Sequence, residues 1–123
     1  DVTYGDTLDH VNFAYAAKLT ALNAVTLASM AAAPAPPANV SIRGQVSADT
    51  TLSWKKVNGA SDYRLHWRLT TSPTWDFHRS VGDKDSFTLE NVVIDNYFFG
   101  VSSIGADGSE SPVVFPGAAG SFD

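Results

Sequence analysis

The feature of this sequence that most constrains its folding is the proline-rich segment Ala33-Pro34-Ala35-Pro36-Pro37-Ala38. Proline lacks a backbone N–H and restricts the residue before it to extended conformations, so a helix cannot continue through this segment and polyproline geometry is favoured. A helical pattern precedes the segment, and an alternating, strand-like pattern follows it. The sequence therefore predicts two parts, residues 1–33 and residues 39–123, with a hinge or boundary at residues 34–38.

The first part predicts one α-helix over residues 13–32. This stretch contains a single charge, Lys18, and no glycine or proline, and Asn12 is placed to accept a hydrogen bond from an N–H of the first turn. Alanines recur at intervals of three and four residues and form a ridge of small side chains on one face: Ala14, Ala17, Ala21, Ala24, Ala28 and Ala31. Because larger apolar side chains run beside this alanine ridge, we expect the helix to pack closely against another surface.

Composition excludes several classes of partner and site. The formal net charge of −5 argues against a surface that follows phosphates, so nucleic acid is not an expected partner. The helix is long enough to cross a bilayer, but Lys18, Asn23 and its weakly apolar alanines argue against a membrane span. The absence of cysteine removes disulfides, thiolate zinc sites and thiol nucleophiles.

The second part predicts seven short strands, because apolar and polar residues alternate between turn signals. In chain order the strands are marked by Val40 and Ile42; Leu52 and Trp54; Tyr63, Leu65, Trp67 and Leu69; Trp75 and Phe77; Phe87 and Leu89; Tyr97, Phe99 and Val101; and Val113 and Phe115. Turn residues separate them at Asn58-Gly59, Gly82-Asp83, Asp95-Asn96 and Asp107-Gly108. The pattern indicates a mainly β fold, a seven-stranded antiparallel immunoglobulin-like β-sandwich with one N-terminal helix. Its expected core is Trp54, Tyr63, Trp67, Phe99 and Val101.

Four segments of the second part carry a resemblance to a known family: Leu52-Ser53-Trp54, the run from Tyr63 to Arg68, Tyr97-Phe98-Phe99-Gly100-Val101, and the turn Asp107-Gly108-Ser109-Glu110-Ser111-Pro112. Residues from about 37 to 116 resemble a fibronectin type III domain. The resemblance implies that Trp54 fills the core and that Tyr97 forms a tyrosine corner with the upstream backbone. Gly100 departs from the family pattern and predicts a bulge or a close backbone approach.

A second resemblance lies before the helix. The stretch Asp6-Thr7-Leu8-Asp9-His10-Val11-Asn12-Phe13, with the alanine-rich helix and its proline-rich exit, resembles the last segment of di-zinc exopeptidases of the bacterial aminopeptidase type. In that family a histidine near this motif ligates zinc, and the closing helix packs on the α/β catalytic core. The ligand position falls on Val2, with Thr3 in register, and valine cannot coordinate zinc. Either the ligand histidine lies upstream of this chain in a rearranged loop, or the resemblance is only architectural. In the first case the resemblance implies a secreted bacterial parent enzyme, extracellular or periplasmic, that binds zinc outside this chain.

The remaining polar residues do not predict a catalytic, cofactor-binding or metal site. His66 and His78 lie on adjacent predicted strands with Asp76 nearby, so a surface site in which the two histidines bind a metal ion is an alternative to an ordinary exposed sheet face. The alternation predicts that Trp67, Trp75 and Phe77 are buried; if they face outward instead, they could form an aromatic surface on which a sugar stacks. His10 is expected at a surface or interface, and Asp6 and Asp9 suit turn closure ahead of the helix better than catalysis. No serine-centred elbow, HExxH motif or phosphate-binding loop occurs.

Two functions follow as hypotheses. In the first, the chain is the non-catalytic C-terminal accessory region of a secreted zinc-dependent exopeptidase, and the missing catalytic domain contacts the alanine ridge. In the second, the chain is an independent binding or adhesion module whose helix mediates docking or self-association. The coding sequence upstream of Asp1 discriminates between them, because only the first requires an α/β domain with His, Asp and Glu zinc ligands there.

Overall fold

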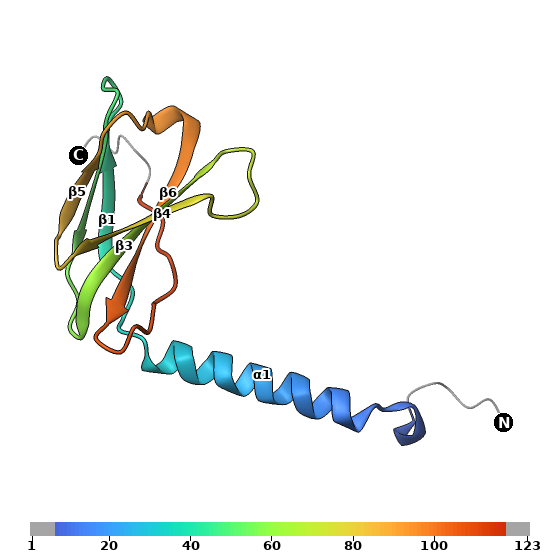
Figure 1. Cartoon of the computed structure of the whole chain (residues 1–123). Coiled ribbons are helices and arrows are strands. Elements are labelled where there is room, and N and C mark those ends of the chain that lie inside the picture. The colour runs from blue at the N-terminus through green and yellow to red at the C-terminus, as the bar shows by residue number, and fades with distance from the viewer. Residues whose placement is uncertain (1–6, 118–123) are drawn as a thin grey trace.

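The computed structural model of the chain describes residues 7–117. A 3₁₀ turn, η1 (Leu8–His10), precedes the helix α1 (Phe13–Ala32). The strands are β1 (Ala38–Arg43), β2 (Thr50–Lys55), β3 (Ala60–Leu69), β4 (Phe77–Gly82), β5 (Ser86–Leu89) and β6 (Tyr97–Gly105), with a second 3₁₀ turn, η2 (Ile94–Asn96), before β6. Figure 1 shows the strands gathered in one body, from which α1 projects as a rod.

The strands form two three-stranded antiparallel sheets, ordered β1-β2-β5 and β4-β3-β6. Their inward side chains make a single hydrophobic core, in which Leu52, Tyr63, Leu65 and Val101 are fully buried. The expected mainly β fold with one helix is therefore confirmed, as is the burial of Trp54, Tyr63, Phe99 and Val101. Trp67 is only half-buried, because it lies at the margin of the core and stacks on Phe77.

The structure has six strands rather than the seven expected, because the segment marked by Val113 and Phe115 does not form a strand in the described residues. Val114 exchanges both backbone hydrogen bonds with Val101, at 2.9 and 2.8 Å, but this is an isolated bridge. Continuing that register would place Pro116 opposite Phe99, and proline has no N–H to donate. The chain instead crosses to the other sheet, where the Gly117 N–H donates to the Val40 carbonyl at 3.1 Å.

The fourth strand begins at Phe77, so Trp75 precedes it rather than belonging to it. Asp76 closes the loop by accepting hydrogen bonds from the Leu69 N–H at 3.0 Å and the Ser72 hydroxyl at 2.8 Å. Trp75 lies instead over Gly100, where an added Cβ would be 3.1 Å from the indole and would clash with Val113. The close backbone approach predicted at Gly100 is therefore confirmed.

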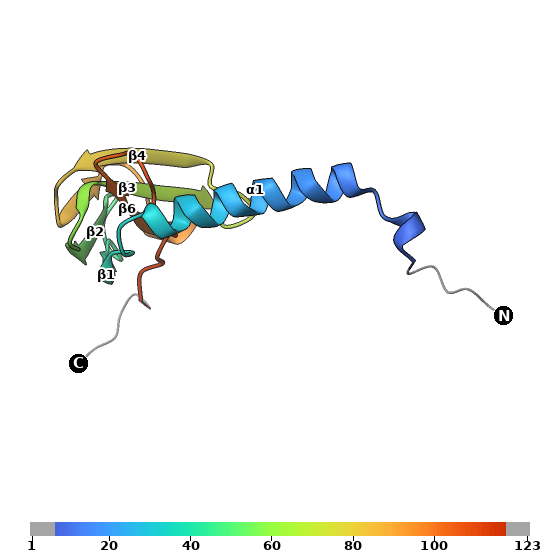
Figure 2. The same cartoon turned by 90° about the horizontal axis from the view of Figure 1, so that it is seen from below.

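The helix α1 has the bounds that the sequence predicts, and the Asn12 side chain caps it by accepting from the Tyr15 N–H at 3.0 Å. No residue of α1 is buried, so nothing in the described part of the chain covers the alanine ridge. Only the last turns of α1 approach the β-structure, where Ala28 and Ala32 face the loop after β6 and the Ser109 hydroxyl donates to the Ala32 carbonyl at 3.2 Å. Figure 2, a view from below, shows α1 again extending away from the strands. Between residues 7 and 117, no helix has the length and apolar character required to cross a bilayer.

Candidate functional site

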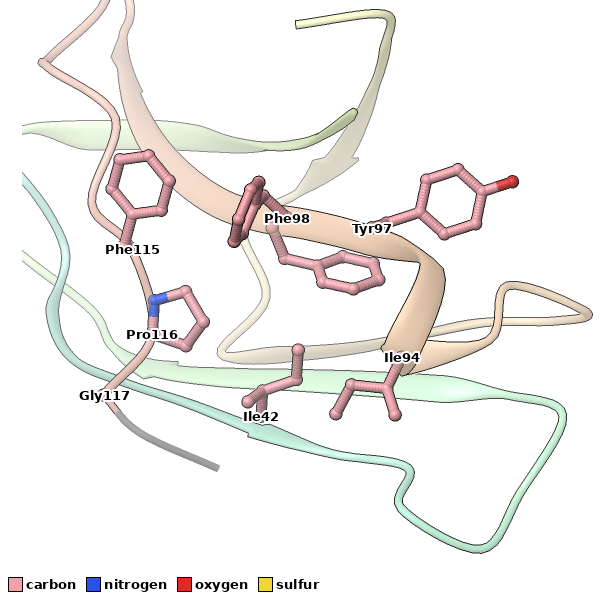
Figure 3. Close-up of a pocket in the computed structure, with 8 residues that line it drawn as sticks. Ile42, Ile94, Tyr97, Phe98, Phe115, Pro116 and Gly117 are labelled. Atoms are coloured by element: carbon pink, nitrogen blue, oxygen red, sulfur yellow. The ribbon is translucent and has the colours of Figure 1, made fainter. Parts of the chain in front are cut away.

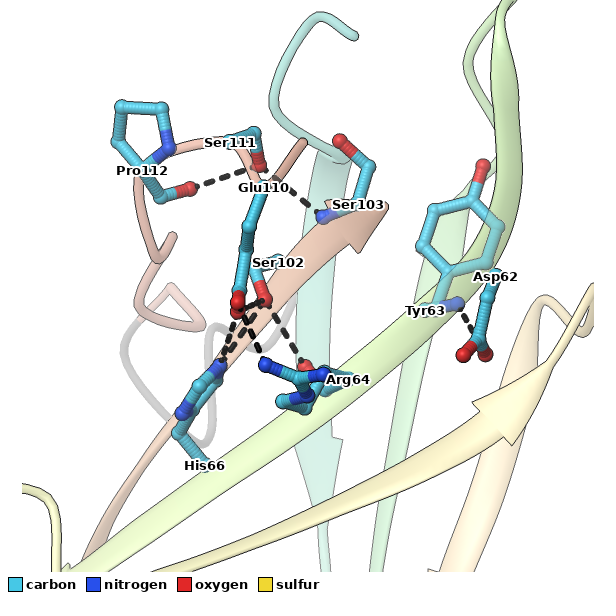
Figure 4. A network of polar contacts seen from close by, with 9 residues as sticks. All are labelled: Asp62, Tyr63, Arg64, His66, Ser102, Ser103, Glu110, Ser111 and Pro112. Carbon is cyan, nitrogen blue, oxygen red and sulfur yellow. Dashed lines mark hydrogen bonds and ion pairs between the residues drawn. The ribbon is translucent and has the colours of Figure 1, made fainter. Parts of the chain in front are cut away.

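The most connected group of polar side chains lies on the outer face of the β4-β3-β6 sheet. Arg64 and His66 alternate along β3 with the buried Tyr63 and Leu65, so they point away from the core. Glu110, in the segment after β6, covers this face and pairs with both: one carboxylate oxygen is 2.6 Å from the Arg64 guanidinium and the other is 3.0 Å from His66 Nε2. Figure 4 shows Glu110 reaching down onto the two β3 side chains.

Ser102 completes this outer-face cluster from the neighbouring strand β6. Its hydroxyl donates to Glu110 Oε1 at 2.6 Å and lies 2.9 Å from His66 Nε2. Burial lowers the pKa of His66 below the ordinary 6.5, and this outweighs the opposing effect of the Glu110 carboxylate, while Arg64 and His78 act in the same direction as burial. The neutral imidazole is therefore the form that fits the folded protein.

The serine, histidine and glutamate of this cluster are not arranged as a catalytic triad. In a triad the nucleophile and the acid contact opposite nitrogens of the imidazole, whereas here Ser102 and Glu110 both contact Nε2. Ser102 is also completely buried, so no substrate reaches its hydroxyl. The contacts hold the segment at Glu110 against the sheet, which is a structural role.

The alternative of a metal pair at His66 and His78 is not supported by the geometry. The two ring centroids are 6.5 Å apart, and His66 Nε2 is already engaged by Glu110 and Ser102. The nearby Asp76 carboxylate closes its own loop. Within residues 7–117, no group of three or more His, Cys, Asp or Glu side chains is placed to hold a metal ion.

The aromatic residues weighed as a sugar platform do not share one surface. Trp67 and Phe77 stack with centroids 5.5 Å apart, whereas Trp75 lies against Phe115 at 5.4 Å, over the outer face of the sheet. Tyr97 packs edge-on against Phe77 and Phe99, and its hydroxyl makes no hydrogen bond to the described residues. The tyrosine corner implied for Tyr97 is therefore not present. The Tyr63 hydroxyl instead accepts a backbone N–H, that of Val57, at 2.8 Å.

The proline-rich segment is held against the β-structure by contacts that the sequence did not reveal. The Ser103 hydroxyl donates to the Ala35 carbonyl at 2.6 Å, and Ser103 is completely buried. Pro34 sits between two glycines, since a Cβ on Gly105 would lie 3.4 Å from it and one on Gly59 would lie 3.9 Å away. This serine and the two glycines fix the point at which α1 leaves the β-structure.

The motif before α1 is described only in part. Leu8–His10 form the exposed turn η1, in which His10 Nδ1 is 2.7 Å from the Thr7 hydroxyl. His10 is therefore at the surface, as expected. Val2, Thr3 and Asp6 lie outside the described residues, so the zinc-ligand register and the turn closure expected of Asp6 with Asp9 stay predictions.

A cavity of about 410 Å³ opens between β6, β1 and the segment that follows Val114. Apolar side chains from these three parts of the chain and from η2 surround it, as Figure 3 shows: Ile42, Ile94, Tyr97, Phe98, Phe115 and Pro116. Phe98 and Phe115 are about half exposed, at 45% and 53%. The strand pattern alone did not predict this apolar cavity, because it exists only where the expected seventh strand departs from β6.

Comparison of the sequence with known proteins identifies fungal relatives. The chain is 38% identical over 116 residues to a probable zinc metalloprotease of Leptosphaeria maculans, an alignment that covers 92% of this chain and 27% of the relative. It is 36% identical over 118 residues to a probable zinc metalloprotease of Pyricularia oryzae, covering 91% of this chain and 23% of the relative. The chain thus spans about a quarter of the length of these curated relatives. It matches no protein-family profile.

Comparison with solved structures identifies the fold of the β-structure. The FN1–FN3 domains of chicken CNTN1 superpose with a TM-score of 0.57 at 22% identity, covering 67% of this chain and 29% of that one. The structure of FN3tt superposes with a TM-score of 0.56 at 20% identity, covering 70% of this chain and 92% of that one. At this level of identity the similarity concerns the fold alone, and it confirms that residues of the second part adopt a fibronectin type III-like fold.

Proposed function

We propose that this chain is the non-catalytic accessory region of a zinc-dependent peptidase. The observation that carries the proposal is the similarity to probable zinc metalloproteases over 92% of this chain, although the chain spans only 27% of the first of them. Most of the length of such a relative therefore lies outside the matched region, where a catalytic domain has room. A fibronectin type III-like fold by itself does not select a function, so the relatives and not the fold support this assignment.

The finer proposal is a secreted exopeptidase of the di-zinc aminopeptidase type. The stretch Asp6–Phe13 resembles the closing motif of that family, and the helix that follows it is present with the bounds expected. In this arrangement residues 1–33 form the last segment of the catalytic domain and residues 39–123 form the accessory domain. Residues 34–38 are the linker between the two domains. Zinc belongs to the catalytic domain of the parent, where it activates water and polarises the peptide carbonyl.

The catalytic domain is the proposed partner of α1. Large apolar side chains on this helix are exposed over most of their surface, including Phe13 at 65%, Leu22 at 62% and Val25 at 65%. A helix with one charge and so much exposed apolar surface gains free energy when a partner covers it. The alanine ridge allows the backbone of that partner to approach closely.

The experiment is a comparison of the full-length protein with residues 1–123. The full-length protein is expected to bind zinc and to release p-nitroaniline from aminoacyl p-nitroanilides, whereas residues 1–123 alone show neither zinc stoichiometry nor hydrolysis. A gene whose upstream region lacks an α/β domain with His, Asp and Glu ligands overturns the proposal. So does a full-length protein that carries zinc and cleaves no peptide bond.

The contact between α1 and the catalytic domain is tested by matched substitutions. Ala24→Glu places a charge on the alanine ridge, and Asn23→Glu places the same charge on the polar side of the same helix. In the full-length protein, Ala24→Glu is expected to expose α1 to limited proteolysis, while Asn23→Glu leaves cleavage unchanged. Equal cleavage of both variants and the wild type contradicts the contact.

The second candidate is an independent module that associates with itself through α1. The observation that favours it is the exposure of α1 along its whole length in the described chain. Sedimentation of the full-length protein separates the two candidates, since a helix covered by a catalytic domain leaves the protein monomeric.

A further inference from the structure

The first half of β1 contains an acceptor sequence for N-linked glycosylation, Asn39-Val40-Ser41. Such a sequence has serine or threonine two residues after the asparagine, and any residue except proline between them. No other asparagine of the chain meets this condition. Because β1 follows the proline-rich segment directly, the acceptor sequence marks the start of the β-structure.

The structure places the acceptor sequence in a β-bulge at the surface. Between Ala38 and Ser41, β1 contains one residue more than the stretch of β2 that it pairs with. Val40 is 7% exposed and belongs to the hydrophobic core, whereas Asn39 and Ser41 on either side of it are exposed. The core therefore anchors the middle of the acceptor sequence and leaves its two functional residues at the surface, where a bulky hydrophilic sugar is accommodated without loss of packing.

The backbone of Asn39 offers a competing explanation for an asparagine here. Its φ of +52° lies in the left-handed region, which asparagine tolerates better than most residues. Asn91 has the same conformation, with φ of +56°, and is followed at the second position by valine. The left-handed backbone thus accounts for an asparagine but not for Ser41, whose hydroxyl makes only a long contact of 3.5 Å with the Ser53 carbonyl.

From this setting we infer that Asn39 carries an N-linked oligosaccharide in the full-length protein. The inference rests on the secreted character in the proposed function, and the fungal source of the relatives supports it, because fungi have a eukaryotic secretory pathway. The donor is an oligosaccharide linked to a lipid pyrophosphate. The bond between C1 of its first N-acetylglucosamine and the pyrophosphate oxygen breaks, and C1 forms a bond to Nδ2 of Asn39. The side-chain amide loses one proton, and the lipid pyrophosphate leaves with the electron pair of the broken bond.

The glycan lies on an edge of the β-structure. In the described part of the chain, β1 is an outer strand of the β1-β2-β5 sheet, and exposed edge strands pair readily with other chains. A bulky hydrophilic group at the start of β1 hinders such pairing and stays in solvent. The catalytic domain that we propose as the partner of α1 therefore does not cover the start of β1.

The test is mass spectrometry of the full-length protein, produced from its own gene and secreted by a yeast host. An endoglycosidase trims each glycan to its first N-acetylglucosamine. Trypsin, which cleaves after Lys18 and Arg43, then releases residues 19–43, a fragment in which only Asn39 has the acceptor sequence. This fragment is expected to carry one N-acetylglucosamine on Asn39 in most molecules.

Four substitutions show whether the acceptor sequence directs the modification. Ser41→Ala and Asn39→Gly are each expected to leave the fragment unmodified, and glycine keeps the left-handed backbone without strain. Ser41→Thr is expected to retain the sugar, because threonine also completes the acceptor sequence. Ser86→Ala is the matched control, since Ser86 is exposed, lies in the same sheet and also makes one contact of 3.5 Å, with Asp85.

The outcomes separate this inference from the proposed function. An unmodified Asn39 in the secreted wild type overturns the inference and leaves the proposed function standing. A sugar that persists on the fragment in Ser41→Ala also overturns it. A protein that stays in the cytosol without the sugar overturns both the inference and the proposed secretion. A secreted protein that carries the sugar on Asn39 but cleaves no aminoacyl p-nitroanilide refutes the peptidase and retains the inference.

Discussion

At the scale of single residues, Gly100 shows how the absence of one side chain positions a whole segment. Trp75, Val113 and the Val114 carbonyl all lie where its Cβ would be, the last at 3.3 Å. Gly100→Ala is therefore expected to lower the free energy of unfolding by about 1–3 kcal/mol, the usual cost of overpacking. Urea denaturation measures the change. Gly117→Ala is the control, because no atom lies within 4 Å of an added Cβ there, and an equal loss in both variants would contradict the steric explanation.

His66 is the residue at which pH should affect stability. Burial lowers its pKa in the folded protein below the 6.5 of the unfolded chain, so the unfolded state binds more protons between these two values. The stability that depends on neutral His66 is thus fully present above pH 6.5 and is lost as the pH falls through the folded-state pKa.

The corresponding experiment measures the free energy of unfolding between about pH 5 and 7, above the range in which most carboxylates titrate. We expect it to decrease toward the acidic end in the wild type and to change less in His66→Gln. His78→Gln is the control on the neighbouring strand, since His78 is exposed. A pH dependence that survives His66→Gln unchanged would assign the effect to another group.

At the scale of elements, the attachment of α1 depends on the contact between β6 and the proline-rich segment. Ser103→Ala removes the hydroxyl that donates to Ala35 and leaves that carbonyl without its partner. A loss of about 1–2 kcal/mol in unfolding free energy is expected. Small-angle scattering should also show a broader distribution of α1 orientations. Ser61→Ala is the comparison, because Ser61 is exposed and its bond to Ile104 is longer, at 3.3 Å.

At the scale of the whole molecule, α1 and the β-structure should be nearly independent in stability. The hydrophobic core draws only on the strands and their connections, and α1 contributes no buried residue. Deleting residues 1–31 keeps the Ala35 contact and is expected to shift the melting temperature by less than about 2 °C. Differential scanning calorimetry tests this, and a drop of many degrees would show that α1 supports the core.

The same exposure of α1 predicts the behaviour of the isolated chain in solution. Apolar patches of this kind associate when their natural partner is absent. Residues 1–123 should therefore sediment as concentration-dependent oligomers, and residues 32–123 as a monomer. If residues 1–123 stay monomeric at high concentration, this result would contradict both the self-association and the apolar contact proposed for α1.

Features that depend on neighbouring residues could be predicted from the sequence. The bounds of α1 follow from Asn12 and the prolines, because capping and the missing N–H act over one turn of helix. The positions of the first six strands follow from the alternation of apolar and polar residues. The prediction that Trp75 belongs to the fourth strand is wrong, because the residues before Phe77 form a loop that Asp76 closes through a hydrogen bond from Leu69, and no local pattern reveals that bond.

The sequence by itself thus determined the two-part organisation, the helix and the mainly β fold, since these arise from local propensity and periodicity. Only the tertiary structure decided which strands pair, what His66 contacts and where the chain leaves the sheet. His66 meets Glu110 and Ala35 meets Ser103 across long stretches of chain, so neither contact is encoded in a local pattern. The absence of the seventh strand has the same origin, because the effect of Pro116 appears only when the register places it opposite a residue of β6.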